Sequence, residues 1–164
     1  MALLIFICLV VLFFVALIND MLESRKKWVK AVPYSKLVNA TLQYTNNILF
    51  ENKISHFPKV HILYKTHPRF KGYYRNSEIY IYTKSNESIE DIVLTILHEL
   101  KHYIDHMKDP QYFEKFNKNY DFSSFSHFLS YTCSPLEISA NEFAYKHQDL
   151  CLKFLAKKGV IKKV

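Results

Sequence analysis

The clearest pattern of apolar and polar positions along the chain lies between residues 89 and 104. Apolar residues recur there three and four positions apart, which is the period of one buried helix face. These positions are Ile89, Ile92, Val93, Ile96, Leu97, Leu100, Tyr103 and Ile104. No glycine or proline interrupts the stretch before Pro110, and Ser85, Asn86 and Ser88 can each cap its start. The sequence therefore predicts a long amphipathic helix that begins near residue 89.

A second helix is predicted from Pro135 to about residue 158. Ser134 is a good N-cap residue, proline is favoured in the first helical turn, and Gly159 is a natural stop. Mainly apolar residues recur along this segment at a helical period. We expect the following stripe to be buried: Leu136, Ala140, Phe143, His147, Leu150, Cys151, Phe154 and Leu155.

The segment before these two helices has the pattern of a helix followed by a small antiparallel sheet. Residues 34–51 are expected to be helical, opening near Pro33 and Ser35. Strands are expected at residues 60–64, 72–75 and 79–82, the last two forming a hairpin around Asn76 and Ser77. A short helix or turn should start at Asp109-Pro110, and the aromatic stretch 113–130 gives no clear assignment. The pattern indicates an α+β fold, with residues 34–164 long enough for one domain around a single core.

Residues 1–18 differ from the rest of the chain because they contain no charged side chain. Eighteen helical residues span about 27 Å, close to the hydrocarbon thickness of a bilayer. A cleaved signal peptide is the alternative, but no basic residue precedes the apolar run and no small-x-small cleavage site follows it. We therefore expect a transmembrane anchor at residues 1–20.

Basic residues follow the apolar run directly, at Arg25, Lys26, Lys27 and Lys30, with Trp28 as a possible interfacial anchor. The positive-inside rule then predicts a single-pass membrane protein whose N-terminus lies outside and whose C-terminal domain is cytoplasmic. We interpret residues 21–33 as a basic juxtamembrane linker that is attracted to anionic lipid.

The remaining composition narrows the possible partners. The net charge is +7, yet no nucleic-acid-binding motif accompanies it, so no nucleic acid is expected as a partner. Three cysteines, one of them within the apolar run, do not make a disulfide framework. Cys133 and Cys151 are expected to be ordinary, buried thiols.

The first predicted helix carries the sequence H-E-x-x-H at residues 98–102. On a helix, His98 and His102 lie one turn apart on the same face, so both imidazoles can reach one metal ion while Glu99 handles a proton. Two histidines leave room for a third protein ligand and a water molecule, as in a catalytic Zn²⁺ site. A surface or packed pair of histidines is the structural alternative.

Glu137, near the start of the second helix, is a candidate third ligand, and Asn141 one turn later could orient a ligand histidine from behind. The same glutamate also completes a capping box with Ser134, in which its carboxylate would bind the Ser134 backbone N–H. The sequence leaves these two interpretations open. Glu142 and Asp105 are weaker candidate ligands, and His106 is too far along the helix to share an ion with His98.

The segment Glu137–Ala144, E-I-S-A-N-E-F-A, resembles the E-x-x-A-N-x-F-A helix of the ImmA/IrrE-type minimal zinc metallopeptidases, which pair it with an upstream HExxH helix. The resemblance covers residues 89–154 and implies a small zincin-like domain with a gluzincin-like arrangement. It implies that His98, His102 and Glu137 are zinc ligands and that Glu99 is the general base. Lys101 replaces a glycine common in the family motif, and the N-terminal apolar segment is a second departure.

Together these observations predict a membrane-anchored zinc metallopeptidase that hydrolyses a peptide or protein substrate with metal-activated water. Tyr131 is the first candidate for stabilising a tetrahedral intermediate, with Tyr103 and His127 behind it; core packing is the alternative for all three. The alternative function is a non-enzymatic, membrane-tethered protein-binding module with a structural or vestigial zinc site.

Overall fold

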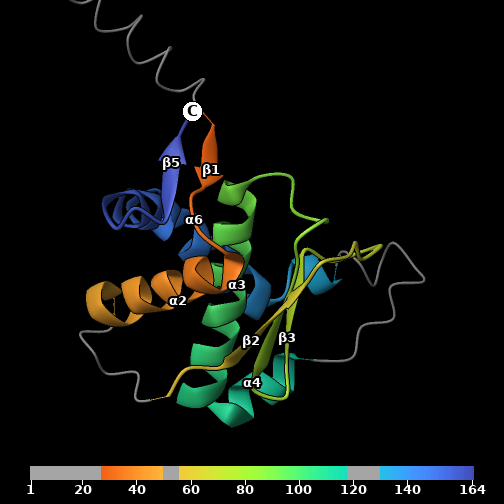
Figure 1. The fold of residues 1–164 in the computed structure, drawn as a ribbon. Helices are drawn as coiled ribbons and strands as arrows, with labels where there is room; N and C mark the ends of the chain where they lie inside the picture. The colour runs from red at the N-terminus through yellow and green to blue at the C-terminus, as the bar shows by residue number, and fades with distance from the viewer. Residues whose placement is uncertain (1–26, 50–55, 118–129) are drawn as a thin grey trace, which may run out of the picture.

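The computed structural model describes residues 27–49, 56–117 and 130–164, which form an α+β fold built around one long helix (Figure 1). The predicted anchor at residues 1–18 lies outside this part of the chain. Within the described residues, no helix is long and apolar enough to cross a membrane.

The central element is α3 (Ile89–Lys108), which carries the H-E-x-x-H sequence. All eight apolar positions predicted for its inner face are buried. Of the three candidate caps, Ser88 is the N-cap residue, and its side chain accepts the Asp91 backbone N–H at 3.1 Å. Asn86 instead ties α3 to the sheet, because its amide donates to the Tyr82 carbonyl and accepts from the Thr95 hydroxyl. The predicted helix is confirmed.

The sheet has three strands in the order β2-β4-β3: β2 (Lys59–Leu63), β4 (Glu78–Tyr82) and β3 (Gly72–Arg75). The expected β3–β4 hairpin is confirmed, and Asn76 and Ser77 take positive φ angles in its turn. The expectation of an all-antiparallel sheet is wrong, because β2 pairs with β4 in parallel. β4, whose Ile79 and Ile81 are fully buried, takes the central position, and β3 pairs antiparallel with its other side as an edge strand.

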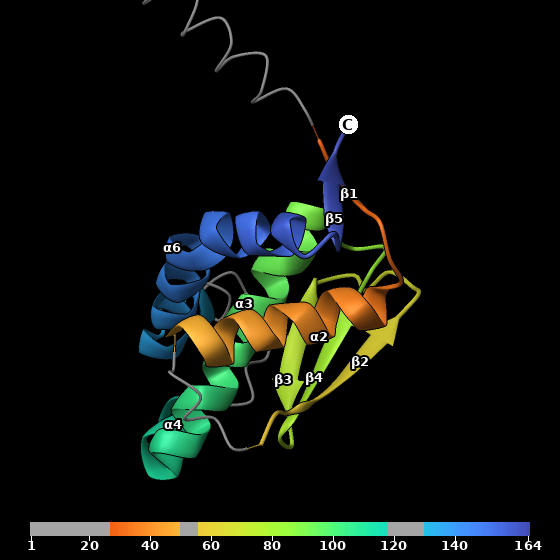
Figure 2. The ribbon, with the colours of Figure 1, turned by 60° about the vertical axis from the view of Figure 1, so that its left-hand side comes forward.

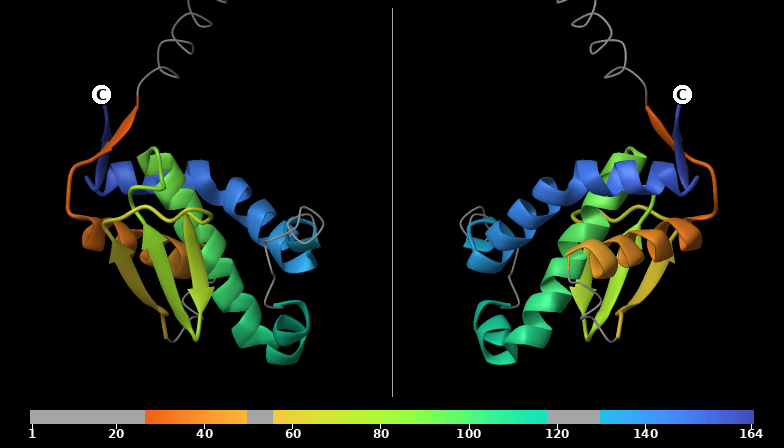
Figure 3. Two further views of the ribbon diagram at one scale, coloured as in Figure 1. Left: turned by 90° about the vertical axis from the view of Figure 1, so that its right-hand side faces the viewer. Right: turned by 90° about the vertical axis from the view of Figure 1, so that its left-hand side faces the viewer.

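Gly72 fixes how closely the sheet approaches α3. A Cβ atom at this position would lie 2.6 Å from the Thr95 side chain and 2.9 Å from the Tyr80 carbonyl oxygen. Glycine is therefore required where β3 passes α3. Figure 3 shows the three strands side by side, with α3 running along the sheet.

The helix predicted from residue 34 is present as α2 (Tyr34–Tyr44), extended by the π-helical turn η1 (Thr45–Leu49). The segment predicted to be a juxtamembrane linker contains β1 (Trp28–Lys30), which the sequence did not predict. β1 pairs antiparallel with β5 (Ile161–Lys163) near the C-terminus. Figure 2 shows this two-stranded ribbon projecting from the end of the domain where α3 begins. The half-buried Trp28 and Val29 explain why the strand packs rather than remaining a free linker.

The predicted C-terminal helix is present as α6 (Pro135–Lys157), which packs against α3. Its buried face includes Leu136, Ala140, Cys151 and Leu155, as expected, but Leu150 is 54% exposed. Leu152, which was not predicted to be part of the stripe, is buried, whereas Leu150 faces solvent. Cys133, expected to be buried, is exposed in the turn before α6. The short helix expected at Pro110 is α4 (Pro110–Phe116).

Candidate metal centre

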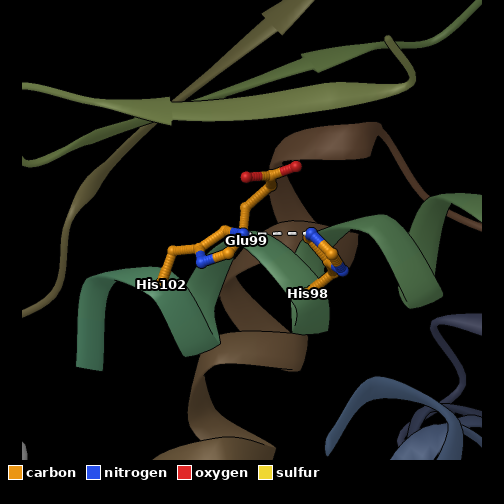
Figure 4. A group of neighbouring side chains, drawn as sticks. All are labelled: His98, Glu99 and His102. Carbon is orange, nitrogen blue, oxygen red and sulfur yellow. Dashed lines mark hydrogen bonds between the residues drawn. The ribbon is translucent and has the colours of Figure 1, made fainter. Parts of the chain in front are cut away.

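His98 and His102 face each other on one side of α3. Their Nε2 atoms lie 3.1 Å apart, and Figure 4 shows the two rings turned toward one another from successive helical turns. His102 is only 7% exposed, whereas His98 is partly accessible. The apolar neighbours Leu97 and Leu100 are fully buried and lock this part of α3 against the core. The helix therefore presents two imidazoles in a fixed orientation at the edge of the interior.

Glu137 reaches the same point from the first turn of α6. One carboxylate oxygen lies 3.2 Å from Nε2 of His98, and the other lies 3.2 Å from Nε2 of His102. The side chain is buried in the contact between the helices. Three potential metal-ligating groups from two helices thus converge within hydrogen-bonding distance of one another.

The hydrogen bonds of Ser134 distinguish the two interpretations of Glu137. The Ser134 hydroxyl accepts the Glu137 backbone N–H at 3.3 Å, so the serine caps the helix as expected. The Ser134 backbone N–H, however, donates to the Tyr131 carbonyl at 3.0 Å. The Glu137 carboxylate is directed at the histidines and does not complete a capping box. This arrangement favours the ligand interpretation.

The three groups fit a zinc ion in both chemistry and spacing. Two imidazole nitrogens and a carboxylate are common zinc ligands, and ligand atoms about 2.0–2.1 Å from a tetrahedral ion lie about 3.4 Å apart. The observed separations of 3.1–3.2 Å are close to that value. Lone pairs of two neutral imidazoles and a carboxylate repel one another at this range unless a proton or a cation lies between them. The site is therefore built for a positive charge.

Glu99 lies beside this cluster rather than within it. A Glu99 carboxylate oxygen and one ring nitrogen of each histidine all lie within 4.8 Å of one another. Figure 4 shows the carboxylate turned toward the sheet, away from the His98–His102 contact. Burial raises the pKa of Glu99 above its usual value. Glu99 is thus placed between the histidines and the edge of the sheet.

The charges of the cluster are coupled. Burial opposes ionisation of Glu137, but its hydrogen bonds with His102 and His98 prevail and lower its pKa to about 2. Burial likewise opposes protonation of His98, yet the hydrogen bond to Glu137 and the nearby charge of Glu99 raise the pKa of His98. Glu137 therefore supplies a permanent negative charge that attracts a cation to the histidines.

Asn141 supports His98 from behind. Its Oδ1 atom lies 3.0 Å from Nδ1 of His98, so the asparagine accepts the Nδ1–H and leaves Nε2 free to face Glu137. The corresponding Nδ1 atom of His102 is buried and has no hydrogen-bond partner among the described residues. The two histidines are therefore held by different means, one by a hydrogen bond and the other by packing.

The other candidate ligands from the sequence do not join the cluster. Asp105 forms an ion pair with Lys101 at 2.5 Å, and Glu142 is exposed. His106 faces away, with Nδ1 2.8 Å from the Tyr74 hydroxyl. These side chains have other partners or lie in solvent, which leaves Glu137 as the acidic residue between the histidines.

The candidates for stabilising a tetrahedral intermediate are not brought to the site in the same way. The Tyr103 hydroxyl donates to the His56 carbonyl at 2.7 Å, so it has a structural role. Tyr131 is half-buried just before α6, and its carbonyl accepts the Ser134 N–H. Its catalytic role stays a prediction. His127 lies outside the described residues. The sequence did not predict that Tyr74 of β3 lies near Glu99. Its strand pattern does not show which strand packs beside this part of α3.

Comparisons with protein-family models, curated proteins and solved structures find no match for this chain. The resemblance to the ImmA/IrrE-type peptidases therefore rests on the residues quoted for it alone.

Proposed function

We propose that this protein is a membrane-anchored, zinc-dependent metallopeptidase of the ImmA/IrrE type. The observation that supports this best is the position of Glu137, whose two carboxylate oxygens each face one histidine of the H-E-x-x-H helix. A glutamate that completed the capping box would instead direct its carboxylate at the Ser134 backbone N–H. The proposed ligands are His98, His102 and Glu137, with Asn141 orienting His98.

In this proposal Glu99 is the general base. A bound zinc ion would make a water molecule more acidic and polarise the carbonyl of a peptide bond. A carboxylate oxygen of Glu99 accepts a proton from the attacking water and then passes it to the leaving amine. Its position beside the histidines suits this role, and burial raises its pKa, which favours a carboxylate that accepts a proton and later returns it.

An extended peptide is the substrate class that the surroundings of Glu99 favour. β3 is an edge strand of the sheet toward which Glu99 is turned. The unpaired backbone groups of an edge strand can bind an extended chain by strand addition. A peptide bound along this edge would bring a carbonyl group close to both Glu99 and the histidines.

One observation favours the alternative of a non-enzymatic binding module with a structural zinc ion. Glu99 is only 5% exposed, and its carboxylate is turned toward the sheet, away from the His98–His102 contact (Figure 4). A general base must turn far enough from this position to reach water at the metal. The experiment must therefore measure metal binding and hydrolysis separately.

The test uses purified full-length protein, wild type and Glu99→Gln, with Glu142→Gln as a matched control at an exposed glutamate. Zinc content is measured by elemental analysis, and hydrolysis with a library of quenched fluorescent peptides. We expect all three proteins to hold one zinc ion. Hydrolysis should be abolished by chelation and should fall about 10²–10⁴-fold in Glu99→Gln only. Zinc binding without cleavage by the wild type would favour the binding module, and normal cleavage by Glu99→Gln would refute the mechanism.

Membrane anchorage through residues 1–18, with the domain on the cytoplasmic side, is part of the proposal and rests on the sequence. Protease protection of intact cells, with a tag after Val164, tests it. We expect the tag to resist external protease and to be digested after the membrane is opened. Digestion from outside, or a mature chain that begins near Asp20, would contradict this topology.

A further inference from the structure

The two ends of the described chain meet in the β1–β5 ribbon. Trp28 pairs with Lys163, and Lys30 pairs with Ile161. Lys27 and Val164 extend this pairing, because the backbone N–H of each donates to the carbonyl of the other at 3.1 Å. Basic segments that are far apart in the sequence are thereby joined into one structural element. Neither segment alone indicated this arrangement.

The ribbon and the C-terminal end of α6 carry a dense positive charge, whereas Glu87, Glu90 and Asp91 lie around the start of α3 beside β1. Residues 27–31 and 157–164 include six lysines and no acidic residue. All six lysines are exposed: Lys27, Lys30, Lys157, Lys158, Lys162 and Lys163. We call these six residues, together with Trp28, the ribbon surface. Trp28, Lys30 and Lys163 lie on one face of the ribbon, and Lys27 and Lys162 lie on the other. Like charges gathered in this way repel one another, so the surface favours an anionic partner.

Two aromatic rings lie among these lysines. The Lys163 ammonium group is 5.2 Å from the centre of the Trp28 ring, and the Lys30 ammonium group is 3.9 Å from the centre of the Tyr34 ring. Trp28 is half-buried. Tryptophan with flanking lysines is typical of membrane interfaces, where the ring lies at headgroup level and the charges contact phosphates.

The ribbon surface has a defined place on the fold. The Trp28 backbone N–H donates to Glu90 at 3.3 Å, which fastens β1 to the first turn of α3. Figures 1 and 2 show the ribbon at this end of the domain, with the C-terminus at its tip and α4 at the opposite end. His98 lies nine residues into α3, about 14 Å along the helix axis from its start.

We propose that the ribbon surface lies on a bilayer that contains anionic lipids and thereby holds the domain at a fixed orientation to the membrane. The charge is supplied by lysines, which suit diffuse attraction to headgroups, rather than by arginines arranged to clamp single phosphates. In the sequence the surface continues directly from Arg25 and Lys26, which follow the uncharged run at residues 1–18. A nucleic acid is the competing anionic partner. The proposal rests on the membrane anchorage proposed above, and not on zinc or on hydrolysis.

Trp28 is the only tryptophan in the chain, so its fluorescence reports on this surface alone. The experiment places full-length protein in lipid nanodiscs of phosphatidylcholine, with or without phosphatidylglycerol. Quenching of Trp28 by a headgroup-labelled lipid is recorded as the ratio of fluorescence with and without quencher. We expect stronger quenching in the anionic discs, and loss of the difference in 0.5 M salt, roughly three times the ionic strength at which the Debye length is 8 Å.

Lys162→Glu/Lys163→Glu should lower the ratio of domains in contact with the bilayer to domains away from it by at least about 25-fold. Each lysine near an anionic surface contributes about fivefold to this ratio. Lys162→Gln/Lys163→Gln should lower it less and guards against a loss of the β1–β5 pairing. Lys108→Glu/Lys115→Glu makes the same charge change at the far end, about 27 Å along α3 from Glu90, and should leave quenching unchanged.

Equal quenching in neutral and anionic discs would overturn the proposal, as would equal effects of the ribbon variants and the far-end variant. Tighter binding of a single-stranded oligonucleotide than of the anionic discs, lost in the ribbon variants, would also overturn it in favour of a nucleic acid.

Discussion

α3 and α6 both supply residues to the candidate metal centre, but they hold these residues in different ways. On α3, the two histidines lie next to fully buried leucines; His102 is held by packing, and His98 is also held by its hydrogen bond with Asn141. On α6, Glu137 lies in the first turn, next to Ile138, which is 46% exposed, and one turn before Asn141, which is also exposed. α3 therefore presents ligands through packing, and α6 presents them through its capped N-terminus.

This difference separates the fold from the site. A change on α3 alters a buried surface, so it affects stability as well as metal binding. A change at the start of α6 affects mainly the metal centre, because the helix is still capped by Ser134 and held by residues further along, such as Ala140 and Leu155. The helices can accordingly be tested one at a time.

The largest effect is expected from the α3 pair. His98→Ala/His102→Ala removes both nitrogen ligands, so zinc content should fall from one ion per chain to background. Zinc at 100 times its dissociation constant should stabilise the wild type by about 2.7 kcal/mol and the double variant not at all. Elemental analysis and zinc-dependent thermal unfolding measure the two quantities. His61→Ala, which removes a histidine paired with Glu78 on the sheet, should behave like the wild type. Retention of a full zinc ion by the double variant would show that the metal site lies elsewhere.

A smaller and more selective effect is expected on α6. Glu137→Gln keeps the shape of the side chain but removes the charge that lies between the histidines. Zinc affinity should fall by more than about 100-fold, beyond the range typical of residues behind the ligands. Without metal, the variant should also lose the stability that the contacts of Glu137 with His98 and His102 supply, so zinc affinity is the deciding measurement.

Ser134→Ala is the complementary variant. It removes the hydroxyl that accepts the Glu137 backbone N–H, so it should cost about 1 kcal/mol of stability. Its zinc affinity should stay within a few-fold of the wild type once the protein is folded. If Glu137→Gln instead kept its zinc affinity, the capping interpretation would be restored and another acidic residue would have to be the ligand.

The contrast between the helices also shows what the sequence could predict. α3 was predictable because its eight buried positions, its serine cap and the H-E-x-x-H spacing all belong to one continuous stretch. Glu137 could be reduced only to two alternatives, because a capping box and a metal ligand need the same residue at the same place. The choice between a capping residue and a metal ligand depends on which group accepts the Ser134 N–H. In the structure this group is the Tyr131 carbonyl.

Features that join distant segments were not predictable from local patterns. The parallel pairing of β2 with β4 and the pairing of β1 with β5 depend on which strands meet in space. Leu150 shows a related limit, since an apolar residue at the edge of a helical stripe can face either the core or solvent. The position of Tyr74 beside Glu99 likewise follows from the packing of β3 on α3, which Gly72 permits.

The smallest effect is expected for Asn141, which contacts a ligand rather than the metal. Asn141→Ala removes the oxygen that accepts Nδ1–H of His98, so the imidazole loses its preferred tautomer and orientation. Zinc affinity, measured by competition with a chelator of known affinity, should fall about 10–100-fold. Because Asn141 is exposed, the metal-free protein should unfold at the wild-type temperature. Asn141→Asp should restore most of the affinity, since a carboxylate accepts the same hydrogen bond and strengthens it. If both variants bound zinc like the wild type, His98 would be positioned by α3 alone, and α6 would contribute only Glu137 to the centre.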